Sequence, residues 1–206
     1  MLSLRCAILA GGRSSRLGQD KRFLSIRGRT CFQRALDAVA ELDPAPFLLV
    51  RDEEDARQLK CATCAILTDP LPGEGPLAAL ANALDRLDKD WLLLLAVDYP
   101  LVTPFFLKRM TTYAERDGRD SLCIVPCEGE MPHVTCALYS KLTAPSCQKF
   151  VDEGGRSIQR WIRTLSPISF VDESIWGRWG AYKPLLNLNT VADLEALESL
   201  DEQGYT

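Results

Sequence analysis

The sequence is poor in histidine, and it lacks both a positive net charge and a long apolar segment. It has one histidine, His133, among 206 residues, and a formal net charge of -4. A metal centre built from several histidines is excluded, and a Ser-His-Asp triad would have to use this one residue. The charge gives no overall basic surface for nucleic acid. The longest apolar run, 91–97, is far too short to span a bilayer, so we expect no membrane segment.

The two common phosphate-binding motifs are also missing. Neither G-x-G-x-x-G nor G-x-x-x-x-G-K-[ST] is present, which argues against a dinucleotide oxidoreductase and a P-loop ATPase. The apolar run within residues 1–10 is too short for an export signal. We therefore expect a cytoplasmic protein.

The sequence has eight cysteines but only one C-x-x-C pair, Cys61 and Cys64. No second pair follows at zinc-finger spacing, so a structural zinc or redox role is the less favoured interpretation. Reduced thiols are the default without an export signal. Several cysteines lie in apolar stretches, where the residue packs as a small hydrophobe.

Up to about residue 115, short apolar runs alternate with amphipathic segments. Strands are predicted at 5–10, 47–50, 65–67 and 91–97, and helices at 30–43, 53–60, 76–87 and 104–115. Thr30 and Gln33 form a capping box, and Pro76 stands where the first turn of a helix tolerates proline. The continuously apolar run 91–97 is typical of a central parallel strand. The alternation predicts an α/β fold with a three-layer, mostly parallel, doubly wound Rossmann-like sheet.

The pattern of the remaining residues is more mixed. Strands are predicted at 121–125, 135–139, 168–171 and 185–186, a loop at 126–133, and a helical region at 144–164 that is interrupted at 154–155. Thr190 and Asp193 resemble a capping box before a last helix that carries Leu194, Leu197 and Leu200. Because we find no repeat, low-complexity tract or linker, residues 1–206 are predicted to form one domain.

The segment that follows the first predicted strand is rich in glycine and positive charge. In open α/β sheets, ligands bind beyond the carboxyl ends of the strands. Gly11 and Gly12 let the backbone turn and approach a phosphate, while Arg13, Arg16 and Lys21 supply charge. The segment predicts a phosphate-binding loop; the alternative is a flexible, solvated basic loop.

Asp98 follows the most apolar predicted strand. A carboxylate at this position suits Mg²⁺, which takes one or two carboxylates together with substrate phosphates. The alternative is an N-cap or loop aspartate. His133 falls in a predicted loop, where a lone histidine is more often structural or solvated.

These motifs resemble the molybdenum cofactor guanylyltransferases, a branch of the wider nucleotidyltransferase group. The first segment is similar to the family signature L-A-G-G-x-x-x-R-[ML]-G-x-D-K. The similar segments span nearly the whole chain in the family's order: 9–21, Asp69 with G-P-L-A at 75–78, V-D-Y-P at 97–100, His133 with C-A-L-Y at 136–139, and L-N-L-N-T at 186–190 with Asp193. The resemblance implies one nucleotidyltransferase domain with that group's sheet.

The resemblance also implies roles for individual residues. The nucleotide would be bound by residues of segment 9–21 and by two later aspartates: Leu9, Ala10, Gly11, Gly12, Arg13, Lys21, Asp69 and Asp98. Arg16, Lys21 and Asp98 would be catalytic, with Asp98 as the Mg²⁺ ligand. Asn187 and Asn189 would lie near the second substrate or the metal, although an Asn-rich turn before a helix is the alternative.

The sequence departs from the family pattern at four positions. Ala79 replaces a glycine, Val97 a cysteine, Val134 a proline and Arg51 an asparagine. Ala79 and Arg51 bear on the choice of base, but neither removes phosphate or metal chemistry.

The implied reaction joins GMP from Mg²⁺-GTP to the terminal phosphate of molybdopterin or the molybdenum cofactor, with release of pyrophosphate. The implied partners are these small molecules and transient contacts with cofactor-biosynthesis or acceptor proteins, without nucleic acid or membrane. Three alternatives stay open: CTP on the same pterin, guanylyl transfer to another phosphorylated metabolite, and a nucleotide-binding module without catalysis. A C-x-x-C metal or redox protein ranks last.

Overall fold

The computed structural model describes residues 2–11, 19–26, 28–180, 183–190, 192–195 and 197. One large sheet has the strand order β10-β7-β9-β6-β1-β4-β5, and β8 pairs with β7. Its strands are β1 (Leu4–Leu9), β4 (Phe47–Val50), β5 (Ala65–Thr68), β6 (Trp91–Ala96), β7 (Cys123–Glu128), β8 (Met131–Pro132), β9 (Cys136–Ser140) and β10 (Ile168–Val171). A separate pair joins β2 (Ser25–Ile26) to β3 (Arg29–Thr30).

The helices are α1 (Cys31–Val39), α2 (Glu53–Leu59), α3 (Pro76–Asp85), α4 (Pro104–Arg116), α5 (Ala144–Asp152), α6 (Ile158–Ile162) and α7 (Glu173–Trp176). Short 3-10 helices are η1 (Lys21–Phe23), η2 (Lys141–Thr143) and η3 (Gly177–Trp179). None of the helices in the described residues is both long enough and apolar enough to cross a membrane.

The sheet is mostly parallel, as predicted. β1 pairs in parallel with β4 and β6, β4 with β5, and β10 with β7, whereas β9 runs antiparallel to both β6 and β7. The expectation that β6 is a fully parallel central strand is therefore wrong for its β9 side. The connection between β7 and β9 is too short for a crossover, which needs a dozen or more residues, so β9 must return antiparallel.

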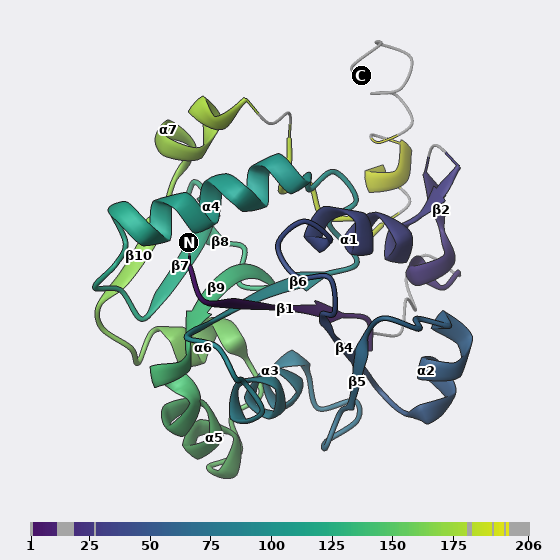
Figure 1. The fold of residues 1–206 in the computed structure, drawn as a ribbon, viewed down its shortest axis with the longest axis horizontal. Coiled ribbons are helices and arrows are strands. Elements are labelled where there is room, and N and C mark those ends of the chain that lie inside the picture. The colour runs from purple at the N-terminus through teal and green to yellow at the C-terminus, as the bar shows by residue number, and fades with distance from the viewer. Residues whose placement is uncertain are drawn as a thin grey trace.

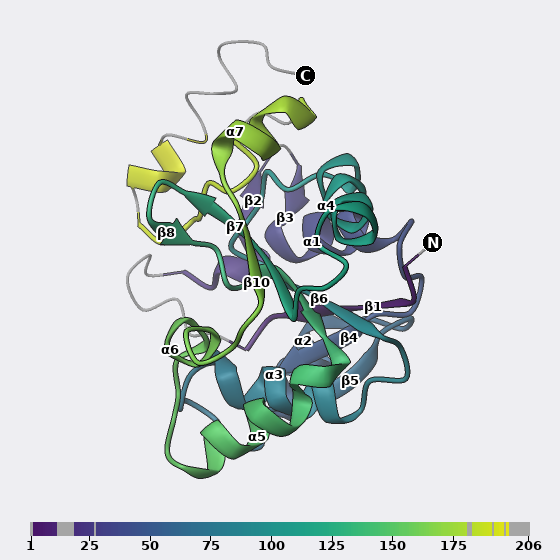
Figure 2. The same ribbon diagram turned by 90° about the vertical axis from the view of Figure 1, so that its left-hand side faces the viewer.

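Side chains alternate between two cores on the two faces of the sheet. In β1, Cys6 and Ile8 pack into the cluster that includes α1 and α4, while Ala7 packs into the cluster that includes α3 and α5. Figures 1 and 2 show these helix pairs on opposite sides of the sheet. Burial on both faces explains why the central strands are almost entirely apolar, and it confirms the three-layer prediction.

The start of α1 follows the prediction, but its end does not. The Thr30 side chain accepts from Gln33 N while the Gln33 side chain accepts from Thr30 N, so the capping box is confirmed. The helix ends at Val39 rather than near Asp43. The Asp43 carboxylate instead accepts from Cys6 N at 2.8 Å and pairs with Arg5, which ties the chain after α1 to β1.

The last third of the chain brings two further corrections. The predicted loop at 126–133 is largely strand, since β7 continues to Glu128 and forms a hairpin with β8. The predicted strand at 185–186 is a turn and loop outside the sheet, although Leu185 is fully buried. An apolar pair buried by a loop cannot be distinguished from a short strand by its pattern alone. The Thr190–Asp193 capping box is confirmed by reciprocal hydrogen bonds; Leu200 lies outside the described residues.

Cys61 and Cys64 form a disulfide, which corrects the expectation that all eight cysteines are reduced thiols. Lys60 ends α2 in the left-handed region at φ 48°, and the turn that follows brings the two Cα atoms to 5.6 Å. That separation lies within the range a disulfide can bridge. The other six cysteines are free and buried, as expected of small apolar side chains.

The burial of these six thiols makes the disulfide testable by counting reactive thiols in the native protein. Burial raises the pKa of Cys6, Cys123, Cys136 and Cys147, which keeps these groups protonated and unreactive. We expect almost no reaction with a thiol reagent before mild reduction and two reactive thiols per chain afterwards. Two reactive thiols without reduction would contradict the disulfide.

Candidate active site

The carboxyl ends of three neighbouring parallel strands meet at one edge of the sheet. Leu9 O, at the end of β1, accepts from Val97 N after β6 at 3.2 Å. On the other side, Ala10 N donates to Leu49 O of β4 at 2.9 Å. This is the edge at which open α/β sheets bind ligands.

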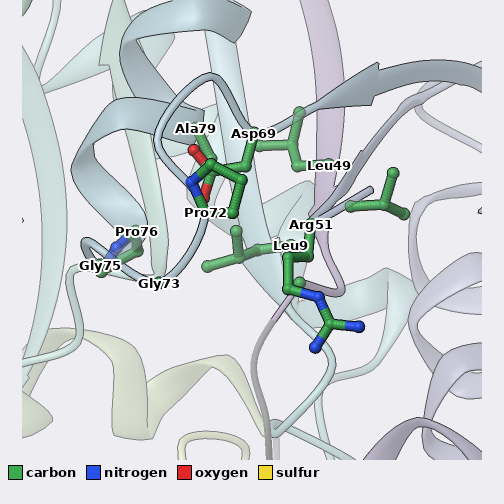
Figure 3. Close-up of a pocket in the computed structure, with 11 residues that line it drawn as sticks. Leu9, Leu49, Arg51, Asp69, Pro72, Gly73, Gly75, Pro76 and Ala79 are labelled. Atoms are coloured by element: carbon green, nitrogen blue, oxygen red, sulfur yellow. The ribbon is translucent and has the colours of Figure 1, made fainter. Parts of the chain in front are cut away.

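A pocket of about 660 Å³ opens at this edge (Figure 3). Its lining comes from the ends of β1 and β4 and from the loop that leads from β5 into α3: Leu9, Gly11, Leu49, Val50, Arg51, Asp69, Pro72, Gly73, Gly75, Pro76 and Ala79. The structure thus brings together three residues predicted to bind nucleotide, Leu9, Gly11 and Asp69. Ala10 is buried beside them. Gly12, Arg13 and Arg16, also predicted to bind, lie outside the described residues.

Two glycines are needed where backbone segments approach closely at the pocket. A Cβ on Gly11 would lie 3.1 Å from Arg51 N, so a side chain would push the first loop away from the end of β4. Gly75 has φ +100°, and its Cβ would lie 2.9 Å from Arg156 O. Sequence reasoning identified Gly11 but gave no individual role to Gly75, whose partner is 81 positions further along the chain.

Asp69 is the first residue after β5 and begins the loop that leads into α3. Its backbone N donates to Val50 O at 2.7 Å, and its Oδ1 accepts from Leu71 N at 2.9 Å. Burial raises the pKa of the carboxyl, and the bond from Leu71 N opposes that rise. A carboxylate fixed at the wall of a pocket can accept hydrogen bonds from a sugar or a base.

The remaining predicted site residues form a second cluster beside the first loop. Lys21 Nζ donates to Asn189 Oδ1 at 2.6 Å, although 168 positions separate the two residues. Asn189 Nδ2 donates to Asn187 Oδ1 at 2.7 Å, and Asn187 hydrogen-bonds to the Asp98 carboxyl. Leu188 N donates to Asp98 O at 2.8 Å, which fixes the Asn-rich segment against the end of β6. None of these four polar residues lines the first pocket as the structure describes it.

The Asp98 carboxyl has the features of an incomplete cation site. Its Oδ1 is buried and has no hydrogen-bond partner within the described part of the chain. Burial raises the pKa of this carboxyl, whereas the charge of Lys21 and the bond from Asn187 act to lower it. No group of three or more His, Cys, Asp and Glu residues that could together hold a metal ion is found in the described ranges. One carboxylate with a vacant buried oxygen suits a cation that takes its other ligands from phosphates and water.

Arg22 is the main structural residue that sequence reasoning missed. Only 6% of it is exposed, and its guanidinium pairs with Asp20 at 2.6 Å and with Asp55 at 2.9 Å. Asp55 also pairs with Arg51 at 3.3 Å. These pairs tie the end of the first loop to α2 and place Arg51 at the pocket wall. The only sequence signal was one more arginine in a basic segment.

Replacing Arg22 with Ala should destabilise the protein by about 3 kcal/mol, because it leaves the buried Asp55 with only one remaining partner. Urea unfolding measures this change. Arg29→Ala is the matched control, since Arg29 and Asp37 form an ion pair with half-exposed side chains whose loss should cost at most about 1 kcal/mol. Equal effects of the two substitutions would contradict the anchoring role.

A second hollow continues from the first past the start of α3. Gly73, Gly75 and Pro76 line both, and the loop between α5 and α6 supplies the far wall. Arg156 in that wall pairs with Glu74 at 2.6 Å, and Arg160 lies exposed beside it. The pair of hollows offers space for two ligands next to each other.

The chain is similar to known proteins along most of its length. Residues 6–168 match the model of a family described as the MobA-like NTP transferase domain. A probable molybdenum cofactor guanylyltransferase of Synechococcus elongatus is 29% identical over 96% of this chain and 99% of its own length. Another, of Methanothermobacter thermautotrophicus, is 30% identical over 78% of this chain and 83% of its own.

Among solved structures, molybdopterin-guanine dinucleotide biosynthesis protein A of Archaeoglobus fulgidus superimposes with a TM-score of 0.82. The match covers 97% of this chain and 99% of the other, at 21% sequence identity. At that identity, the similarity shows the fold.

Proposed function

Because the chain belongs to the MobA-like NTP transferase domain family, we propose that it joins GMP from GTP to the terminal phosphate of molybdopterin or the molybdenum cofactor and releases pyrophosphate. The chain is a nucleotidyltransferase. The relatives' names supply the two substrates, and the observation that carries the proposal for this chain is the pocket at the strand ends beside a buried carboxylate with a vacant oxygen.

The nucleoside of GTP is proposed to occupy the first pocket. Leu9 offers apolar surface, and Asp69 offers a fixed acceptor for hydrogen-bond donors of the nucleoside. Backbone N–H groups of the loop that begins at Gly11 would bind the phosphates. Arg13, Arg16 and Lys21 are proposed to neutralise the triphosphate, with Lys21 held in position by Asn189.

Asp98 is proposed to hold a divalent cation, which we propose is Mg²⁺. Bound there, such a cation would neutralise negative charge on the reacting phosphates. Asp98 supplies the carboxylate, Asn187 orients that carboxylate, and Asn189 holds Asn187. The chemistry of this donor set fits a hard cation, since Asp98 supplies carboxylate oxygens and no group of three or more His, Cys, Asp and Glu residues among those described could hold a metal ion by itself.

The acceptor is proposed to lie in the second hollow. Arg160 is exposed at its wall, where a guanidinium can bind a phosphate. The shared residues Gly73, Gly75 and Pro76 put this hollow directly beside the nucleotide pocket. An acceptor phosphate placed there would attack the α-phosphorus of GTP in line with the departing pyrophosphate. Because that nucleophile is already an anion, the reaction needs positioning and charge neutralisation rather than a strong base.

The proposal is tested first by nucleotide binding. With Mg²⁺ and GTP at about 100 times its dissociation constant, we expect the melting temperature to rise by about 5–10 °C, because GTP binds only the folded state. ATP, CTP and UTP serve as matched controls. A shift with CTP alone would change the proposal to cytidylyl transfer. Ala79 and Arg51, which depart from the family pattern, both lie in the pocket wall. No shift with any of the four would contradict nucleotidyl transfer by this chain.

A further inference from the structure

A row of buried polar side chains leads from the Asp98 loop into the interior. Tyr99 and His133 are 5% and 4% exposed. The Tyr99 hydroxyl lies 3.2 Å from His133 Nδ1 and 3.4 Å from Thr135 Oγ1. On the other side of the imidazole, Nε2 lies 3.4 Å from Glu128 Oε2. None of these groups has a role of its own in the proposed nucleotidyl transfer.

The donor and acceptor of each hydrogen bond in the row follow from the bond between Asn189 and Asn187. Asn189 Nδ2 donates to Asn187 Oδ1, so the Asn187 amide offers its N–H groups to its other partners. Those partners are the Asp98 carboxyl and the Tyr99 hydroxyl. Since the Tyr99 oxygen accepts from Asn187, its own proton is free to be donated to His133 Nδ1.

The protonation of His133 agrees with this direction. Burial lowers the pKa of the imidazole, although the Glu128 carboxylate acts to raise it, so the ring is neutral at pH 7. With Nδ1 accepting from Tyr99, the proton must be on Nε2, which faces Glu128. The Nε2–H group then faces the Glu128 carboxylate at 3.4 Å, although it makes no hydrogen bond within the described residues.

We propose that Tyr99 and His133 are positioning residues for the cation-binding carboxylate of Asp98, acting through Asn187, with His133 as the neutral Nε2–H tautomer. The inference rests on the proposed metal-dependent transfer. His133, as a second partner of the hydroxyl, keeps Tyr99 in place, and Tyr99 keeps the Asn187 amide in place. The amide in turn holds the Asp98 carboxyl, whose Oδ1 has no hydrogen-bond partner among the described residues and would be available to a cation. Partners of this kind change metal affinity or activity by about 10–100-fold when they are removed.

The row could instead serve only to satisfy buried polar groups, and metal affinity separates the two roles. We would measure the dissociation constant of Mn²⁺ by electron paramagnetic resonance in the presence of GTP and without an acceptor, so that no turnover occurs. Tyr99→Phe and His133→Leu should each weaken Mn²⁺ binding about 10-fold. The double variant should be no weaker than the worse single one, since both break the same row.

Two further variants serve as controls for Tyr99→Phe and His133→Leu. His133→Asn keeps an acceptor near the position of Nδ1 and should restore most of the affinity. Thr135→Val removes the other neighbour of the same hydroxyl, outside the row, and should change affinity less than about twofold. Tyr99→Phe or His133→Leu protein that is less stable but binds Mn²⁺ as the wild type does would overturn the proposal. A wild type that binds no Mn²⁺ with any nucleotide would overturn the proposed function itself.

The tautomer is tested independently of metal and activity. His133 is the only histidine, so ¹⁵N spectra of the untagged chain show one imidazole. We expect a protonated Nε2 and an unprotonated Nδ1 at pH 7 in the wild type. A protonated Nδ1 would mean that His133 donates to Tyr99. That result would overturn the proposal, whatever the outcome of the Mn²⁺ and nucleotide binding measurements.

Discussion

Replacing Asp98 with Asn lowers kcat for nucleotidyl transfer by about 10²-fold or more, the scale that follows loss of a group stabilising charge in the transition state. The substitution keeps the shape of the side chain and removes only the charge that would hold the cation. Steady-state pyrophosphate release at saturating GTP and Mg²⁺ measures the change.

The same substitution should not destabilise the protein. Asp98 carries a buried oxygen without a hydrogen-bond partner within the described residues, and burial raises the pKa of its carboxyl. A neutral amide relieves the cost of burying that charge, so the melting temperature without metal should be unchanged or higher. Asp88→Asn is the matched control, because Asp88 is exposed and pairs with Arg5. Near-normal activity of Asp98→Asn, or equal losses in the two variants, would refute the metal assignment.

Removing the charge of Lys21 should have an effect of similar size. In Lys21→Ala, the triphosphate loses one cation and Asn189 loses the donor at 2.6 Å that holds it. We expect kcat/KM for GTP to fall by about 10²-fold. Both the KM for GTP and kcat should change, because the lysine would bind the ground state and the developing charge on pyrophosphate.

The control for this variant is Lys149→Ala on α5. The Lys149 side chain is 78% exposed and lies 3.8 Å from Glu153, so its loss should leave kcat/KM within about twofold. If Lys21→Ala kept normal kcat/KM while Lys149→Ala reduced it, the assignment of the phosphate site to the first loop would be wrong.

The sequence predicted the sheet and the strand ends well because both depend on local patterns. The apolar runs that became β1, β4 and β6 are buried on both faces, and the residues that follow them must therefore share one edge. Leu9, Gly11 and Asp98 could be assigned to that edge without any knowledge of tertiary contacts.

Contacts between distant segments could not be predicted in this way. Nothing in the local sequence relates Asn187 to Asp98, or Arg156 to Gly75, since these approaches depend on how loops cross the finished sheet. The same holds for the buried pair of Arg22 and Asp55.

The hairpin of β7 and β8 was missed for a different reason. Pro126 and the short connection around Gly129 have the composition of a loop, yet Pro126 pairs in β7 as part of the parallel register with β10. A proline normally argues against strand, and here its tertiary partners override that preference.

The central claim is tested most directly by following the α-phosphate of the nucleotide. The untagged chain would be incubated with Mg²⁺, molybdopterin and either GTP or CTP labelled at the α-phosphate, and the pterin product would be isolated. We predict that label from GTP appears in the pterin product together with one pyrophosphate per transfer, and that CTP gives little transfer. Transfer from CTP alone, or no label on the pterin from either nucleotide, would contradict the account.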